Sequence, residues 1–190
     1  MLKTTLTAAI LAASTAGLAH AEAHMANGNP TVGGAPMMQE MNIVENAVNS
    51  PIHTTLVAAV QQAGLVETLS GPGPFTVFAP TDEAFAGISP DSLAALMEPG
   101  AKDQLTQILT CHVVGAEVFS DAIAGMIAGD GGAHPVETLG GCILTAQMDG
   151  DMITLTDQNG RVANVTIADV DQSNGVIHVI DRVLLPQQAG

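Results

Sequence analysis

Residues 75–85, with the sequence Phe75-Thr-Val-Phe-Ala-Pro-Thr-Asp-Glu-Ala-Phe85, decide the fold of this chain. The apolar run that ends at Ala79 predicts a β-strand, and Pro80 stops the strand because proline has no N–H for a ladder. Thr81 then predicts the N-cap of a helix. Asp82 would lie in the first turn of that helix, where the helix dipole favours negative charge.

A second segment lies about a hundred residues further on, Asn174-Gly-Val-Ile-His-Val-Ile-Asp-Arg-Val-Leu-Leu-Pro186. Asn174 and Gly175 predict a tight turn, and the β-branched run that follows predicts a buried strand. His178 is a single polar residue within that run. The two segments together predict a strand and helix entry early in the domain and a core strand at its end.

These segments resemble the two signature motifs of the fasciclin (FAS1) domain family. Leu109-Thr-Cys-His-Val-Val114 resembles the family's central Tyr-His motif, with Cys111 in place of tyrosine. The motifs occur in the family's order, and residues 41–187 fit one such domain, as in a single-domain secreted member of bacterial type. The resemblance implies an α+β fold: a wedge of two β-sheets with helices from the first half of the domain packed on one side. It also implies packing and hydrogen-bonding roles for His112 and His178.

The periodicity of the rest of the chain agrees with an α+β domain, because helical spacing dominates early and strand patterns dominate late. The expected helices cover residues 43–49, 53–63, a segment beginning at 89–91, and 101–110; the expected strands cover 142–148, 152–156, 161–168 and 176–185.

The first residues have the layout of a secretory signal peptide over residues 1–21, with Lys3, an apolar run and a small-residue cleavage site. Residues 22–40 are rich in Met, Gly and Pro without periodicity, which predicts a flexible linker. The expected location is therefore outside the cytoplasm, periplasmic or extracellular. No later run reaches the roughly twenty apolar residues of a membrane helix.

Charge and composition exclude several classes of function. The chain has 19 acidic and 4 basic residues, a formal net charge of −15, and neither Trp nor Tyr. So acidic a protein repels phosphate backbones and anionic lipid heads, which excludes nucleic-acid binding. A protein or cell-surface partner of unknown identity is expected instead.

Cys111 and Cys142 are the two cysteines of the chain. In an exported protein, oxidation favours a structural disulfide between them over two free thiols. Such a bridge would contribute on the order of 3–4 kcal/mol by constraining the unfolded chain.

Three patterns suggest binding sites, and each has a plainer alternative. Asp169 to Gly175 resembles a calcium loop, but the glycine falls at the wrong position and position twelve is Ile180. His112 and His178 would need further ligands to hold a metal, so structural roles are expected for both. The leader contains His24 together with Met25, Met37, Met38 and Met41. The soft sulfur atoms of the methionines suit Cu(I), but their irregular spacing favours a simple linker.

The resemblance adds one candidate adhesion site, because animal adhesive members of the family carry an Asp-Ile pair just before the second motif. Asp169 and Val170 occupy the matching positions, with valine in place of isoleucine. The pair is expected in a polar loop.

Sequence signatures of enzymes are missing, including the nucleophile elbow, the zinc-protease helix and the phosphate-binding loop. The expected function is that of an exported, non-enzymatic, cofactor-free interaction module in cell adhesion or at the cell surface. The alternative is a periplasmic or extracellular protein that binds a small ligand or copper.

Overall fold

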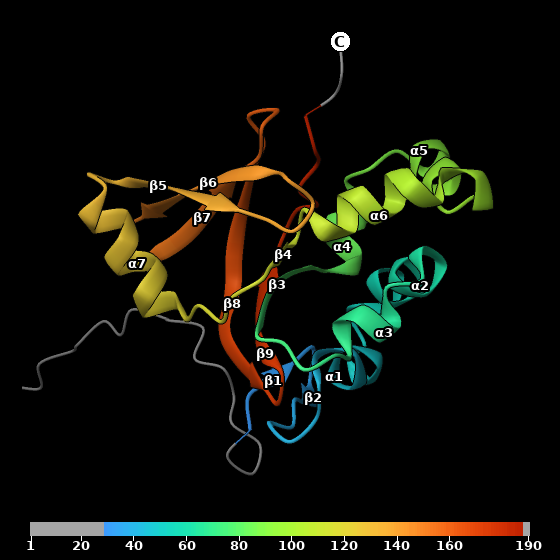
Figure 1. Ribbon diagram of the computed structural model, residues 1–190, viewed down its shortest axis with the longest axis horizontal. Coiled ribbons are helices and arrows are strands. Elements are labelled where there is room, and N and C mark those ends of the chain that lie inside the picture. The colour runs from blue at the N-terminus through green and yellow to red at the C-terminus, as the bar shows by residue number, and fades with distance from the viewer. Residues whose placement is uncertain (1–28, 188–190) are drawn as a thin grey trace, which may run out of the picture.

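The computed structural model describes residues 29–187, which form helices on either side of one central sheet (Figure 1). The helices are α1 (Ile43–Asn49), α2 (Thr54–Ala63), α3 (Val66–Leu69), α4 (Asp82–Ala86), α5 (Pro90–Leu96), α6 (Lys102–Thr110) and α7 (Ser120–Gly129), with a 3-10 turn η1 (Pro99–Ala101) before α6. The strands are β1 (Thr31–Val32), β2 (Ala35–Pro36), β3 (Phe75–Pro80), β4 (Val113–Val114), β5 (Ala133–Glu137), β6 (Ile143–Asp149), β7 (Met152–Thr156), β8 (Val162–Gln172) and β9 (Gly175–Ile180).

Local sequence fixes the ends of the early helices. Asn42 and Glu45 form a capping box at the start of α1, since each side chain accepts a hydrogen bond from the other residue's backbone N–H. Gly64 ends α2 in the left-handed conformation, with φ of 73°. Ser89 caps α5, and Pro90 occupies its first position. These boundaries agree with those expected from the sequence.

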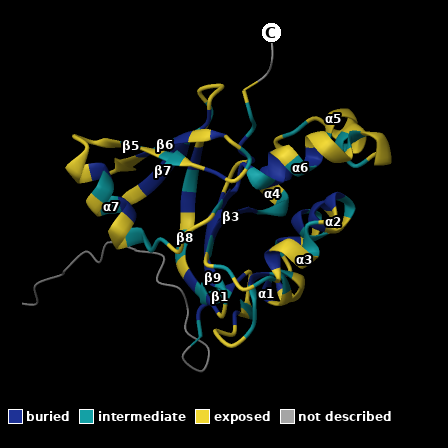
Figure 2. Ribbon diagram, viewed as in Figure 1, coloured by how far each residue is buried: buried dark blue, intermediate teal, exposed yellow. Residues whose placement is uncertain are grey.

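The central sheet has seven strands in the order β4-β3-β9-β8-β7-β6-β5. β3 and β9 pair in parallel, with Phe75 opposite Gly175, whereas the other neighbours are antiparallel. The two quoted segments therefore lie side by side although a hundred residues separate them. Figure 2 shows both strands as buried, and every residue of β9 is buried.

Strand β8 joins two halves of the sheet. It has eleven residues and pairs with β9 on one side and β7 on the other. Its register with β9 shifts between Val165 and Ile167 and again between Ile167 and Val170, and such bulges bend a strand and increase its twist. The α+β class is confirmed, and the two sheets of the expected wedge share this one strand.

Each half of the sheet covers its own hydrophobic core. Helices α1 to α6 pack against the β3 and β9 half, around residues such as Leu56, Ile108 and Val179. Helix α7 lies on the other side in Figure 1 and packs Ile123 and Ile127 against Leu144 and Leu155 of the second half. The early helices thus gather on one side as expected, whereas α7 and the edge strand β5 were not predicted.

Residues 29–40 differ from the expected flexible linker. Strands β1 and β2 form a small hairpin around Gly33 and Gly34, whose φ values of 61° and 87° suit a tight turn that glycine adopts without strain. Val32 and Met37 are each 2% exposed and belong to the core. The linker prediction is therefore wrong for this part of the segment, because the hairpin buries two apolar side chains.

Candidate functional site

The residues expected to matter sit at the junctions between elements. Thr81 caps α4 and accepts a hydrogen bond from the Ala84 N–H at 3.2 Å. The Asp82 carboxylate reaches across to the start of α2 and accepts from the Thr55 N–H at 2.7 Å and from the Thr54 hydroxyl at 2.8 Å. Since His53 provides no side-chain cap for α2, Asp82 caps that helix from outside it.

These contacts control the charge of Asp82. Burial alone raises the pKa of the carboxyl, but the hydrogen bonds from Thr55 and Thr54 stabilise the anion and lower the pKa overall. Asp82 is therefore ionised at neutral pH, as a carboxylate at the positive end of a helix should be. The first motif thus joins α2 to α4 and presents no reactive group.

Asn174 and Gly175 connect the second motif to the helices. The Asn174 amide donates to the carbonyls of Leu69 and Gly71, both at 2.8 Å, and its side-chain oxygen accepts from the Ile43 N–H at 3.0 Å. One side chain therefore ties the hairpin before β9 to α1 and to the end of α3. Gly175 has φ of 150°, and a Cβ there would overlap the Phe75 backbone. Only glycine lets β9 approach β3 so closely.

His112 and His178 are buried, and backbone groups bind both nitrogens of each ring. His112 Nδ1 lies 2.8 Å from the Ile108 carbonyl, and Nε2 accepts from the Leu184 N–H at 2.9 Å. His178 Nε2 lies 2.9 Å from the Val118 carbonyl, and Nδ1 accepts from the Asp169 N–H at 3.2 Å. Neither ring keeps a free nitrogen for a metal or a substrate.

Burial is the main cause of the lowered pKa of both rings, because a charged imidazole loses its hydration there. It lowers the pKa of His112 to about 4, against a smaller opposing effect of the Ile108 carbonyl. Both rings are therefore neutral at physiological pH. Neutral imidazoles with satisfied nitrogens link distant backbone segments.

The expected adhesion pair is not a loop. Asp169 and Val170 lie within β8, and Val170 is 0% exposed in the core. Asp169 has φ of 59°, and its carboxylate accepts from the Ser120 N–H at 2.7 Å and from the Ser120 hydroxyl, at the first residue of α7. The prediction that this pair lies in a loop is wrong, because both residues belong to β8. Val170 packs in the core, and the exposed Asp169 bonds to the start of α7.

Of the proposed copper ligands, the structure describes only Met37, Met38 and Met41. His24 and Met25 lie outside the described residues, and Met37 is buried in the core. Met38 and Met41 lie near the side-chain amides of Asn29 and Asn49. Within residues 29–187, no group of three or more His, Cys, Asp or Glu is arranged to hold a metal ion. Met37 is therefore not available as a ligand, because its side chain packs in the core.

Cys111 and Cys142 form a disulfide with a Cα–Cα distance of 5.3 Å, as expected. Both residues are buried. The bridge ties the end of α6 to the start of β6, and so joins the helical side of the molecule to the second half of the sheet.

One face of the second half of the sheet is open. The strand pairing aligns Thr145 with Thr156 and Thr156 with Val162, while α7 packs on the opposite face. Ile143 and Val162 are 46% and 43% exposed. We call this surface the open face; its residues are Ile143, Thr145, Gln147, Thr156 and Val162. Thr154 and Asn164 lie on the same side of the sheet, but Thr154 is buried and Asn164 is half-buried.

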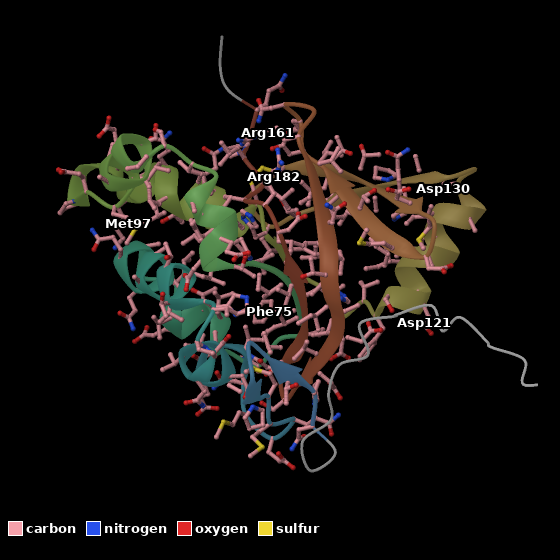
Figure 3. The ribbon with its side chains drawn as sticks, turned by 180° about the vertical axis from the view of Figure 1, so that it is seen from behind. Phe75, Met97, Asp121, Asp130, Arg161 and Arg182 are labelled. Atoms are coloured by element: carbon pink, nitrogen blue, oxygen red, sulfur yellow. A yellow bond between two sulfur atoms is a disulfide. The ribbon has the colours of Figure 1, made fainter. Side chains whose placement is uncertain are left out.

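The open face differs from the rest of the surface in charge. None of its five residues is ionisable, although the chain carries a formal net charge of −15. Charged residues border it instead: Glu137 of the edge strand pairs with Ile143, and Arg161 precedes Val162. Figure 3 labels Arg161 and Arg182 at one end of the sheet, and Asp121 of α7 and Asp130 just after that helix on the other side of the view.

No part of the chain from residue 29 to residue 187 forms a helix long and apolar enough to cross a membrane.

Sequence reasoning missed the open face and Asp157. The carboxylate of Asp157, 4% exposed, accepts from the N–H groups of Asn159, Arg161 and Leu185 and from Arg161 Nε at 3.2 Å, so it holds the β7–β8 turn against the last segment. The Asp-Gln-Asn-Gly turn pattern was a usable signal for the turn, but not for the contact with Leu185.

Comparison with known proteins identifies relatives of the whole domain. The Fasciclin domain profile matches residues 51–186. Protein sll1483 of Synechocystis is 40% identical over 173 residues, which cover 89% of this chain and 87% of that protein. Human periostin is 35% identical over 132 residues, 70% of this chain but 14% of periostin. A FAS1 domain pair from the insect cell adhesion molecule fasciclin I superposes with a TM-score of 0.67 at 19% identity, covering 76% of this chain and 51% of that one.

Proposed function

Since the chain belongs to the fasciclin domain family, we propose that it is an exported, non-enzymatic interaction module of the cell surface. The contacts of the motif residues support this proposal. Their polar side-chain atoms form hydrogen bonds within the fold; the residues are Thr81, Asp82, Asn174, His112 and His178. The motifs thus build a scaffold, and binding falls to the surface.

The open face is the single observation that carries the proposal. An interface excludes water from the groups that it covers, and covering a charged side chain without a partner costs free energy. Interface centres are accordingly depleted in charged residues. A face of threonine, glutamine and aliphatic side chains on a rigid sheet meets that requirement, whereas the acidic surface elsewhere does not.

We assign the partner as a protein or cell-surface polymer of low charge density. Strong net negative charge on this chain disfavours acidic partners and anionic lipid surfaces by long-range repulsion. Adhesion is the finer form of this function, and fasciclin I is itself a cell adhesion molecule of insects. The similarity between this chain and fasciclin I is a similarity of fold.

Val162→Glu tests the proposal, with Ala94→Glu as a control. Both residues are exposed and both changes add one negative charge, but Ala94 lies on α5, away from the open face (Figure 1). Beads that carry each purified variant are mixed with envelope and extracellular fractions of the producing cells, and attachment of whole cells is counted in parallel. We expect Val162→Glu to weaken capture and attachment at least about tenfold, because binding would remove the added carboxylate from water without giving it a partner.

Ala94→Glu should behave as the unmodified protein. Equal binding by both variants, after circular dichroism shows that each is folded, would remove the open face from consideration. A second open-face variant, Thr145→Glu, guards against a local effect at Val162.

A further inference from the structure

An apolar cavity of about 160 Å³ lies between helices α1, α2 and α3 and the sheet. Valines from three helices line much of it: Val44 and Val48 from α1, Val57 and Val60 from α2, and Val66 from α3. Valine is short, so opposing valines leave space that leucine side chains would fill. Protein cores rarely keep voids larger than a water molecule, so a cavity of this size is unusual.

The cavity offers no hydrogen-bond partner to water in its interior. Of the described residues that line it, only Gln61 and His112 carry polar side-chain atoms. Gln61 is exposed at the rim, and both nitrogens of His112 bind backbone groups, the Ile108 carbonyl and the Leu184 N–H. A buried water needs two to four polar partners, so the interior is dry.

The cavity reaches the surface between α1 and α2. Val48, 57% exposed, and the exposed Gln61 both belong to its lining. Phe78 and His112 lie on the sheet side, beneath the helices. An entering molecule would thus meet a rim that includes Val48 and Gln61 first and an apolar floor afterwards.

We propose that this cavity binds a small uncharged apolar group, about the size of a benzene ring or the end of a short acyl chain. Three observations determine the class. The volume matches that of a dry aliphatic cavity that holds benzene, about 150 Å³. The lining lacks a free donor or acceptor, which excludes ligands that need a hydrogen bond inside. The net charge of −15 disfavours a carboxylate head group at the entrance.

Titration of the purified protein with benzene, phenol and 1-octanoylglycerol tests the proposal, with methyl chemical shifts of Val, Ile and Leu followed by NMR. We expect saturable shifts confined to the cavity valines with benzene, and binding at least about fivefold weaker with phenol, whose hydroxyl would be left unpaired. Stronger binding of 1-octanoylglycerol than of benzene would identify a lipid chain end as the source of the apolar group. Binding of benzene alone would identify a free small molecule.

Ala47→Leu places a larger side chain into the cavity from α1, and Ala58→Leu makes the same change on the exposed side of α2. Both residues are helical, and leucine is a good helix former, so neither change should prevent folding. Ala47→Leu should abolish the benzene shifts and raise the melting temperature, whereas Ala58→Leu should leave binding unchanged. Val57→Met provides a second filled cavity if Ala47→Leu is poorly folded.

Two results would overturn the proposal. One is benzene binding that survives both filling substitutions, and the other is an absence of saturable shifts with every probe. Neither result bears on the open face, because its residues lie on β6, β7 and β8 and do not line this cavity.

Discussion

Opening the Cys111–Cys142 disulfide should destabilise the folded protein strongly. The two cysteines are 31 residues apart. In the chain-entropy treatment, a cross-link over that distance restricts the unfolded chain by about 4 kcal/mol at 25 °C. For a domain of this size, that loss would lower the melting temperature by roughly 8–16 °C.

The assay separates the cross-link from the packing of its sulfur atoms. Urea unfolding is followed by circular dichroism for the oxidised protein, for the same protein after reduction with dithiothreitol, and for Cys111→Ala combined with Cys142→Ala. Reduction keeps both side chains in the buried site and removes only the bond. The double substitution also removes two buried sulfur atoms, so it should cost about 1–2 kcal/mol more than reduction.

A loss of less than about 1 kcal/mol on reduction would show that a constraint on the unfolded chain is not the main contribution of the disulfide. A change in the slope of the urea dependence without a shift in the midpoint would contradict the prediction as well, because a changed slope indicates a change in the surface exposed on unfolding. Mass spectrometry of the protein before reduction verifies that the starting material is bridged.

Two further predictions concern the buried polar residues. His178→Ala should cost about 3 kcal/mol in urea unfolding, because it leaves a cavity and two unpaired backbone groups. His134→Ala should cost about 1 kcal/mol, because this half-buried ring contacts the exposed Asp130 carboxylate rather than buried backbone groups. Unchanged melting of His178→Ala would reject a structural role for the buried ring. Asp82→Asn should cost about 1 kcal/mol of stability at pH 7, as the loss of a charged cap does. The pKa of Asp82 is lower in the folded protein than in the unfolded chain. The stabilisation by the carboxylate is therefore present above about pH 4 and is lost as the pH falls through the folded-state pKa. The difference between Asp82→Asn and the unmodified protein should therefore shrink in acid.

Sequence reasoning located most of the elements that depend on local signals. Asn42, Thr81 and Ser89 each cap the helix that their sequence context predicts. The starts of β3 and β9 were placed within one residue, although β9 ends at Ile180, earlier than expected. Caps and turns act over three or four residues, so their information is contained in the segment itself.

The structure shows side-chain contacts between residues far apart in the sequence, which sequence reasoning did not predict. Asp169 was predicted for a polar loop, but it lies within β8 and bonds to Ser120, 49 residues away. Asp82 was expected to serve its own helix and caps α2 as well. The residues next to an aspartate do not show whether its carboxylate will cap its own helix or a distant one. The tertiary arrangement decides which helix end the carboxylate reaches.

Some elements that were not predicted do have local signals. Gly33-Gly34 between short apolar runs is a two-residue hairpin signal, and it marks the β1–β2 turn. Ile123 and Ile127 have the spacing of a buried helix face in α7. The open face was harder to predict, because alternation along a strand shows which side is polar and cannot show that no helix covers it.

The central position of β9 has a consequence for how the chain reaches its native state. β9 is the last strand of the described fold, yet it lies between β3 and β8 and contributes to both cores. A nascent polypeptide therefore cannot close either core until this strand has been synthesised. Such pairing across a hundred residues gives the topology a high contact order, which slows folding. A stop codon just before β9 should for the same reason leave an incompletely folded chain, with β3 exposed as an open sheet edge.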